Sequence, residues 1–404
     1  MNSKISALCK KRDLLVIFRG LAQDEAFRRL MVLLGSDCED QANFIADYAD
    51  FVSALYESGT VDITEHLLRI TLEDENFFIV KTAKDKKPPL LVQECLLHEL
   101  QFIQELSELT PDDFIEDMDY DGYIPRWENS PADIIGSYME RVRLIGQYGY
   151  GKYAGNSMFI FRDGSIVPVR YPDEQKLSEL YGYETQRKAV MDNTLALVEG
   201  RPALNALLYG DAGTGKSSTV KALVNEYSGQ GLRLIEITKD QLRDIPAIID
   251  EISGNPLKFI IFIDDLSFTS GEDCFGALKA TLEGSVSARA RNTVIYATSN
   301  RRHLVRESFS DREGDDIHRN DTMQETLSLS ARFGLRVNFS RPDKKAYTAI
   351  AAELARSHGI DLPEEEIALK AEQFAISSGN GRSPRTAKQF VDQLRSDMEL
   401  SAKG

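Results

Sequence analysis

Eight consecutive residues have the types and spacing that can hold the phosphate groups of a nucleotide. Residues 210–217 read Gly-Asp-Ala-Gly-Thr-Gly-Lys-Ser, the pattern G-x-x-x-x-G-K-S. Small residues let backbone N–H groups turn inward around phosphates, the lysine supplies charge to the β and γ oxygens, and the serine hydroxyl can ligate Mg²⁺. The predicted phosphate-binding residues are Gly210, Asp211, Ala212, Gly213, Thr214, Gly215, Lys216, Ser217 and Ser218. Of these, Lys216 is also predicted to be catalytic and Ser217 to bind Mg²⁺.

The flanking residues decide whether such a motif is meaningful. The apolar run 206–209 enters the loop as a buried strand would, and residues 218–227 leave it with helix formers and apolar residues at helical spacing. The alternative is a glycine-rich turn before an ordinary helix. A strand before the loop and a helix after it favour phosphate binding.

Two carboxylates follow another apolar run. Residues 259–263, Phe-Ile-Ile-Phe-Ile, predict a buried strand, and Asp264 and Asp265 come directly after it. Because ligands gather at the carboxyl ends of parallel strands, we expect both acids to face the phosphate loop. Asp264 would hold Mg²⁺ in its outer shell, and Asp265 would orient or deprotonate the attacking water. A purely structural role for two acids in this place is disfavoured.

A polar amide ends the next predicted strand. Residues 293–298 are followed by Ser299 and Asn300. An amide at this strand tip can reach a γ-phosphate or the attacking water, so Asn300 is a third catalytic candidate. By itself the signal is weak, and it gains weight from the order of the two motifs before it.

These side chains require a parallel sheet to position them. We place strands at residues 206–209, 232–237, 259–263, 293–298 and 335–339, with helical stretches between them. From Pro342 onward the pattern is all-helical. The predicted fold class is therefore α/β, with a core at 176–341 and a helical lid at 342–404. Residues 301–325, which are polar and mixed in charge, predict a mobile loop.

The first half of the chain carries no motif with evident chemistry. Residues 1–115 predict a helical domain, for docking, for oligomerisation or for packing alone. Residues 116–175 predict an acidic linker and a small β-hairpin, in which Asp163-Gly164 joins two apolar runs. Within the linker, residues 117–128 match the calcium-loop pattern D-x-D-x-D-G-x5-E. Pro125, and a helix start predicted at Ser130-Pro131, instead favour an acidic linker.

Composition limits the classes of function. The chain has 404 residues, 42% of them hydrophobic and 28% charged, which predicts two or three globular domains. The formal charge of −16 argues against broad duplex binding, which needs a basic field. No membrane span or targeting segment is predicted, and four scattered cysteines indicate reduced thiols in the cytoplasm.

Taken together, residues 176–404 resemble an AAA+ ATPase module. The shared features are the loop at 210–217, the acids at 264–265 and Asn300, which stands where the family has its sensor-one residue. Residues 180–186, Leu-Tyr-Gly-Tyr-Glu-Thr-Gln, resemble the segment that lines the family's adenine pocket. More narrowly, residues 264–268, 300–303 and 327–333 resemble a group of uncharacterised prokaryotic AAA+ proteins, a domain of unknown function.

The resemblance implies ATP and Mg²⁺ as cofactors and assigns two arginines. Ser330-Ala-Arg332-Phe-Gly-Leu resembles the arginine-finger segment, so Arg332 would act in trans and the active species would be a homo-oligomer. The other reading of Arg332 is an ion pair at a helix end. Ser383-Pro-Arg385-Thr-Ala resembles the start of the sensor-two helix. Arg385 is therefore expected to contact the nucleotide, with Arg382 as the alternative.

Two departures from the family pattern shape the functional hypotheses. The usual glutamate is Asp265 here, one methylene shorter, and residues 238–244 lack the aromatic grip of protein-threading unfoldases. The leading hypothesis is an oligomeric ATPase that remodels or loads an unknown protein or nucleoprotein partner. The alternative is a partner-triggered ATP-binding switch with little basal hydrolysis. A small-molecule kinase fits badly, because Asn300, Arg332 and the helical lid would have no role.

Overall fold

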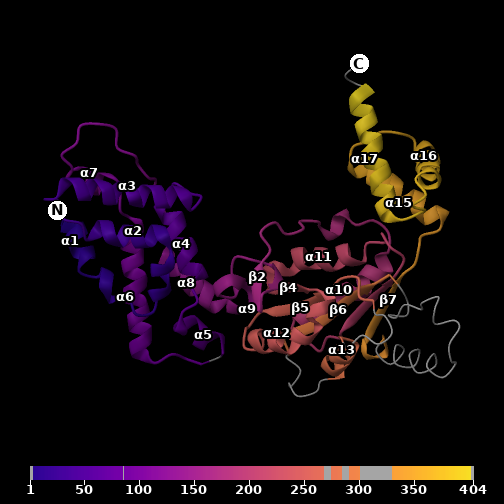
Figure 1. Cartoon of the computed structure of the whole chain (residues 1–404), viewed down its shortest axis with the longest axis horizontal. Coiled ribbons are helices and arrows are strands. Elements are labelled where there is room, and N and C mark those ends of the chain that lie inside the picture. The colour runs from indigo at the N-terminus through magenta and orange to yellow at the C-terminus, as the bar shows by residue number, and fades with distance from the viewer. Residues whose placement is uncertain (1–2, 85, 268–273, 284–290, 301–329, 402–404) are drawn as a thin grey trace. The chain divides into compact units, whose positions relative to one another are not determined.

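A computed structural model describes residues 3–84, 86–267, 274–283, 291–300 and 330–401. The chain forms two compact units, residues 1–155 and 156–404, which are described separately below (Figure 1). Within the described ranges, no helix is both long enough and apolar enough to cross a bilayer. The loop predicted at 301–325 lies outside these ranges.

The first unit is helical. Its helices are α1 (Ser3–Cys9), α2 (Glu25–Leu34), α3 (Gln41–Glu57), α4 (Ile63–Glu73), α5 (Phe77–Ala83), α6 (Leu90–Ser107), α7 (Asp112–Ile115), α8 (Ile134–Arg143) and α9 (Ile145–Tyr148). Several begin at an Asp or Asn whose side chain accepts a backbone N–H from the first turn, as at Asp62 and Asp133. That cap sets the start of α8 at Ile134, a few residues after the helix start predicted at Ser130-Pro131.

The core of the first unit contains an aromatic cluster and the buried carboxylate of Glu99. Trp127 contacts the rings of Tyr48, Phe51 and Phe114, and its indole N–H donates to the carbonyl of Leu109 at 2.9 Å. Elsewhere in this core, the carboxylate of Glu99 on α6 accepts hydrogen bonds from the backbone N–H groups of residues 16–18 at 2.8–3.1 Å, and Glu99 is only 5% exposed. Its charge is therefore satisfied by the chain segment that it fixes.

The second unit is built on a seven-stranded sheet with the order β2-β1-β4-β5-β6-β3-β7. The strands are β1 (Met158–Arg162), β2 (Ser165–Pro168), β3 (Ala206–Gly210), β4 (Leu232–Ile237), β5 (Lys258–Ile263), β6 (Thr293–Ser299) and β7 (Leu335–Phe339). Every pair is parallel except β1–β2. The apolar runs of β4 and β5 are buried almost throughout, as strands covered on both faces must be.

Helices cover the two faces of this sheet (Figure 1). On one face lie α10 (Glu184–Val198) and α11 (Lys216–Tyr227), whose apolar side chains share a core with alternate strand residues such as Leu208 and Phe262. On the other lie α12 (Ile245–Ile252) and α13 (Cys274–Glu283). The sheet is thus the middle layer of three, with the ends of its parallel strands left open between the helices.

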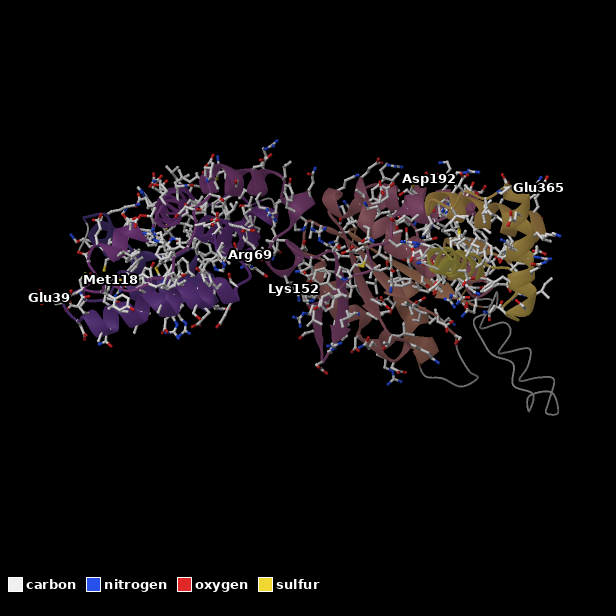
Figure 2. The ribbon with its side chains drawn as sticks, turned by 90° about the horizontal axis from the view of Figure 1, so that it is seen from above. Glu39, Arg69, Met118, Lys152, Asp192 and Glu365 are labelled. Atoms are coloured by element: carbon white, nitrogen blue, oxygen red, sulfur yellow. The ribbon has the colours of Figure 1, made fainter. Side chains whose placement is uncertain are left out.

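Three helices, α15 (Lys344–Ser357), α16 (Glu364–Ser377) and α17 (Pro384–Ser401), form the C-terminal lid. They have a core of their own, which includes Tyr347, Ile350 and Phe390. Many charged side chains are exposed, among them Asp192 on α10 and Glu365 on α16 (Figure 2). The predicted α/β fold with a parallel-sheet core and a helical lid is confirmed.

The β-hairpin shows how the sheet extends beyond the predicted strands. Asp163 and Gly164 both have positive φ values, 51° and 76°, as the tight turn between β1 and β2 requires. Strand β1 then pairs in parallel with β4, and Phe159 is fully buried. The domain division predicted from the sequence placed this hairpin with the acidic linker at residues 116–175. Its pairing with β4 makes it part of the sheet.

Candidate functional site

The phosphate-loop residues form a tight turn between β3 and α11. Gly210 has φ +137°, and a Cβ at this position would lie 2.2 Å from the carbonyl oxygen of Phe339 on β7. Gly213, with φ +76°, passes directly under the lid, where a Cβ would lie 3.2 Å from Cβ of Arg385. Glycine at these two positions therefore allows both the backbone turn and the close packing around it.

Lys216 is held inside the loop that it follows. It is 6% exposed, and its Nζ donates to the carbonyls of Gly210 at 3.1 Å and Asp211 at 2.7 Å and to Oδ1 of Asn300 at 3.1 Å. Burial lowers the pKa of this lysine, and the nearby carboxylates oppose that shift. The ammonium group is thus positioned and partly desolvated, as a charge meant for a phosphate group should be.

Ser217 and Asp264 meet at the carboxyl end of β5. The Ser217 hydroxyl donates to Oδ1 of Asp264 at 2.6 Å. Thr298 on β6 donates to the same oxygen at 2.5 Å and accepts the backbone N–H of Asp265 at 2.9 Å. A hydroxyl and a carboxylate oxygen lie side by side here, and both are ligand types that Mg²⁺ takes.

Asp265 has an unusual backbone and a fixed carboxylate. Its φ of 51° lies in the left-handed region, where Asp and Asn occur several times more often than other non-glycine residues. Asn300 donates its side-chain N–H to Oδ1 of Asp265 at 2.7 Å. Because Asn300 also accepts from Lys216, one amide joins the loop lysine to the second acid.

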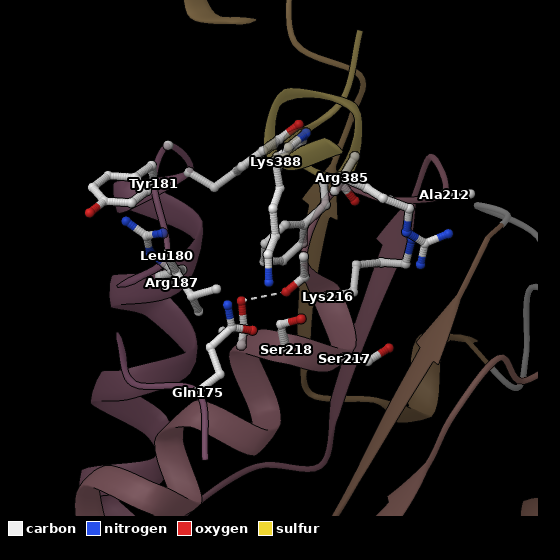
Figure 3. Close-up of a pocket in the computed structure, with 18 of the residues that line it drawn as sticks. Gln175, Leu180, Tyr181, Arg187, Ala212, Lys216, Ser217, Ser218, Arg385 and Lys388 are labelled. Atoms are coloured by element: carbon white, nitrogen blue, oxygen red, sulfur yellow. Dashed lines mark hydrogen bonds between the residues drawn. The ribbon is translucent and has the colours of Figure 1, made fainter. Parts of the chain in front are cut away.

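These groups line a cavity of about 500 Å³ between the sheet and the lid (Figure 3). The lining residues are Gln175, Glu179, Leu180, Tyr181, Gly182, Tyr183, Arg187, Ala212, Gly213, Thr214, Gly215, Lys216, Ser217, Ser218, Thr219, Asp264, Asp265, Thr298, Asn300, Phe339, Ile350, Leu354, Pro384, Arg385 and Lys388. Leu180, Tyr181 and, from α15, Ile350 lie at one end together with the charged Arg187, whereas Lys216, Ser217 and Arg385 lie at the other end (Figure 3). The volume and this division fit a nucleotide, with its base at the apolar end.

Lid and loop are joined by direct hydrogen bonds. The backbone N–H of Arg385, at the start of α17, donates to the carbonyl of Gly213 at 3.1 Å. The carboxylate of Asp211 accepts the backbone N–H of Arg341 at 2.8 Å, in the segment that leads into α15. The hydroxyl of Tyr183 donates to the carbonyl of Ser340 at 2.7 Å, and burial raises its pKa to about 12.

The structure brings most of the predicted site residues to this cavity. Gly210 and Asp211 are the exceptions within the loop, because they face the β7 side instead of the cavity. Arg385 lines the cavity, whereas Arg382 is paired with Glu372 through two contacts of 2.8 and 2.9 Å. Arg332, just before β7, is described but is not among the lining residues.

Sequence reasoning missed several lining residues. Thr298 lies two positions before Asn300, so the alternation of a strand would have pointed both side chains to the same side. Lys388 lies three positions after Arg385, which is about one helical turn. Arg187 and Gln175 carried no signal in the sequence, because only the fold brings them to the phosphate loop.

The calcium-loop pattern at 117–128 is not built as a calcium site. Residues 119–127 form no helix, and Glu128 instead pairs through its backbone with Asp62. In the part of the chain that the structure describes, no group of three or more His, Cys, Asp or Glu side chains is arranged to hold a metal ion. A magnesium ion bound by the Ser217 hydroxyl, with Asp264 in its outer shell, would therefore take its remaining ligands from phosphate and water.

Comparisons with known proteins found one family and several similar proteins. Residues 155–398 match the family described as "Protein of unknown function (DUF815)". Over 116 residues the chain is 31% identical to the replication factor C large subunit of Staphylothermus marinus, covering 27% of each protein, so it spans about a quarter of that relative. Two RuvB structures of Thermotoga maritima are also similar. A RuvB mutant has 17% identity, 57% coverage of this chain, 67% coverage of its own and a TM-score of 0.40. The structure titled as a Holliday junction branch migration motor has 17% identity, covers 57% of this chain and 66% of its own, and has a TM-score of 0.38.

Proposed function

Because the chain belongs to the DUF815 family and has the fold of AAA+ P-loop ATPases, we propose that it binds and hydrolyses Mg²⁺-ATP in this cavity. The nucleotide state would set the angle between the α/β core and the lid, and this change would act on a macromolecular partner. The protein would thus hydrolyse the phosphoanhydride bond of ATP and use the resulting change to remodel or load a protein or nucleoprotein partner.

One observation carries the proposal. Two strand ends, those of β5 and β6, are connected to the phosphate loop by short hydrogen bonds: Ser217 to Asp264, Thr298 to Asp264, and Asn300 to both Lys216 and Asp265. A glycine-rich structural turn would need no acid or amide near it. The donor and acceptor types also match the parts of an ATPase: charge for phosphate, oxygen ligands for a cation and a carboxylate for water.

Each residue then has a role in hydrolysis. Lys216 and the N–H groups of residues 213–218 would hold the phosphates, with Ser217 and Asp264 on the metal side. Bound Mg²⁺ would neutralise phosphate charge and orient the γ-phosphate. Asp265 would orient or deprotonate the attacking water at its free carboxylate oxygen, and Asn300 would fix that carboxylate while contacting the water or γ-phosphate. Arg385 would join the nucleotide from the lid.

We assign Arg332 to a neighbouring protomer's site. Its position outside the cavity lining is compatible with that role, and an arginine supplied in trans contributes about 10³–10⁵ in rate. The active species would be a homo-oligomer. The helical first unit would dock the partner, and the free thiols of Cys9, Cys38 and Cys95 suit the cytoplasm proposed as its location.

A second candidate is a switch that binds ATP and hydrolyses it only when a partner arrives. The observation that favours it is the engagement of Asp265, whose carboxylate is already hydrogen-bonded to Asn300 on a left-handed backbone. A partner would have to free this carboxylate for the water. In this variant of the proposal, basal turnover is very low while nucleotide affinity is high.

Turnover of Mg²⁺-ATP per protomer, measured as protein concentration is raised, separates these possibilities. Turnover that climbs with concentration and is lost in Arg332→Ala supports the oligomeric ATPase. Arg336→Ala, at an exposed position on β7 outside the cavity, is the matched control. Negligible turnover with ATP still bound supports the switch, and failure to bind ATP at all contradicts both.

A further inference from the structure

A second lid cation enters the nucleotide cavity beside the predicted sensor arginine. Lys388 lies on α17 three residues after Arg385, and both are exposed and line the cavity. In the part of the chain that the structure describes, neither takes part in an ion pair, unlike Arg382, which is bound to Glu372. Two exposed cations that form no ion pair there, at the mouth of a phosphate site, attract a polyanion.

The two cations lie toward different parts of the cavity. The backbone of Arg385 is bonded to Gly213, and its positive charge acts on Lys216, whose pKa it helps to lower. Arg385 is therefore on the side of the loop lysine, which serves the outer phosphates. In Figure 3, Lys388 lies between Arg385 and Tyr181, toward the apolar end of the cavity.

The apolar end fixes the orientation of a nucleotide. Leu180, Tyr181 and Gly182 gather there, and Ile350 from α15 lies so close to Gly182 that a Cβ on this glycine would be 2.7 Å from it. A base placed at this end and a γ-phosphate placed at Lys216 leave the inner phosphates between them. Lys388, on α17 of the lid, lies over this middle region, between Tyr181 and Arg385 (Figure 3).

We propose that Lys388 is a nucleotide-binding residue that contacts the inner phosphates shared by ATP and ADP, while Arg385 contacts the γ-phosphate. This inference rests on the proposed nucleotide binding and divides the work of the lid. Arg385 distinguishes ATP from ADP, and Lys388 keeps the lid engaged with either nucleotide. The lid would thus remain attached to the product after hydrolysis and would leave when ADP is released.

The test is a comparison of affinities, independent of turnover. Isothermal titration of the full chain with ADP and with the nonhydrolysable analogue AMPPNP gives the ratio of the two dissociation constants. We expect Lys388→Ala to weaken both by roughly tenfold and to leave their ratio unchanged, because one charge-assisted contact is removed from each complex. We expect Arg385→Ala to weaken AMPPNP more than ADP, and Lys388→Arg to restore much of the lost affinity.

Two controls keep the outcome interpretable. Lys370→Ala removes the same charge from α16, where this lysine pairs with Glu366, and should bind both nucleotides as the parent does. Circular dichroism checks that each variant keeps its helices. Parent-like affinities in Lys388→Ala, or weakening of AMPPNP alone, would overturn the assignment of Lys388. If the parent chain binds neither nucleotide, the proposed function itself fails.

Discussion

Asn300 and Asp265 hold each other across the ends of two neighbouring strands, with 2.7 Å between the amide nitrogen and the carboxylate oxygen. The amide oxygen of Asn300 faces Lys216 at 3.1 Å. One side chain therefore sets both the second acid and the loop lysine. Its partner needs a left-handed backbone, which explains why a short Asp stands at position 265: this conformation favours Asp and Asn over Glu.

Removal of the amide should impair the chemical step more than binding. In Asn300→Ala, Asp265 loses its hydrogen-bond donor and Lys216 loses an acceptor. We expect turnover to fall roughly a hundredfold, the scale for loss of one preorganised donor, with ADP affinity unchanged. Steady-state kinetics and calorimetry measure the two quantities. Parent-like turnover would show that Asn300 only supports the fold.

Asp265→Asn tests the carboxylate itself. Asparagine tolerates the same φ and keeps a hydrogen-bonding oxygen, so the turn should be preserved. We expect turnover to fall at least roughly a hundredfold, because the general base is lost, and ATP affinity to be retained. Asp240→Asn, an exposed change outside the cavity, is the control. Full activity in Asp265→Asn would exclude Asp265 as the base.

Thr298 should govern how well the site uses magnesium. Its hydroxyl holds Asp264 at 2.5 Å and the N–H of Asp265 at 2.9 Å. Thr298→Val keeps the shape but removes both bonds, so the Mg²⁺ concentration for half-maximal turnover should rise about tenfold. Thr298→Ser, which keeps the hydroxyl, should restore it. An unchanged magnesium dependence in the valine variant would contradict this positioning role.

The ion pair between Glu372 and Arg382 should make lid stability depend on acidity. The hydrogen bonds from Arg382 hold the pKa of Glu372 below its ordinary value of 4.5. A lowered folded-state pKa stabilises the lid fully above about pH 4.5, and this contribution is lost as pH falls through the folded pKa. The melting temperature of Glu372→Gln should therefore lie a few degrees below that of the parent at pH 7.

Acidification should reduce this difference between Glu372→Gln and the parent, since both then lack the charge on residue 372. Glu366→Gln, which affects an exposed pair with Lys370, should change the melting temperature little at either pH. Circular dichroism at pH 7 and at a pH well below 4.5 provides the comparison. A constant difference between Glu372→Gln and the parent would show that the ion pair is not its cause.

The buried Glu99 should control the stability of the first unit. Its carboxylate accepts the N–H groups of Val16, Ile17 and Phe18, so Glu99→Ala leaves three backbone donors without their acceptor. We expect a loss of about 3 kcal/mol or more in the free energy of unfolding. Trp127 is the single tryptophan of the chain and is buried in the first unit, so its fluorescence in urea follows this unit alone.

The exposed Glu94 lies on α6, as Glu99 does, and offers a matched control for Glu99→Ala. Glu94→Ala removes an equal charge without touching a buried donor, and its urea midpoint should stay close to that of the parent. If Glu99→Ala and Glu94→Ala unfold at the same urea concentration, the segment at residues 16–18 is not held by Glu99.

The sequence by itself determined the phosphate loop, the strands around it and the acids at their ends. The spacing of Gly210 to Ser217 follows from how the backbone must turn around a phosphate, which is a local property. The apolar residues of the strands around the loop indicate burial in a sheet. Once the strands are parallel, their carboxyl ends meet, so Asp264, Asp265 and Asn300 come together without further information.

Tertiary structure alone decided which polar groups face the cavity. Arg382 and Arg385 lie three residues apart, and the sequence favoured Arg385 but left Arg382 as an alternative; in the structure Arg382 is bound to Glu372 and Arg385 lines the cavity. Asp211, although inside the motif, turns toward Arg341. Strand β1 joins the sheet through β4, and Lys388 reaches the cavity through the packing of the lid. The physical reason is that these contacts join residues far apart in the chain, so that no local pattern encodes them.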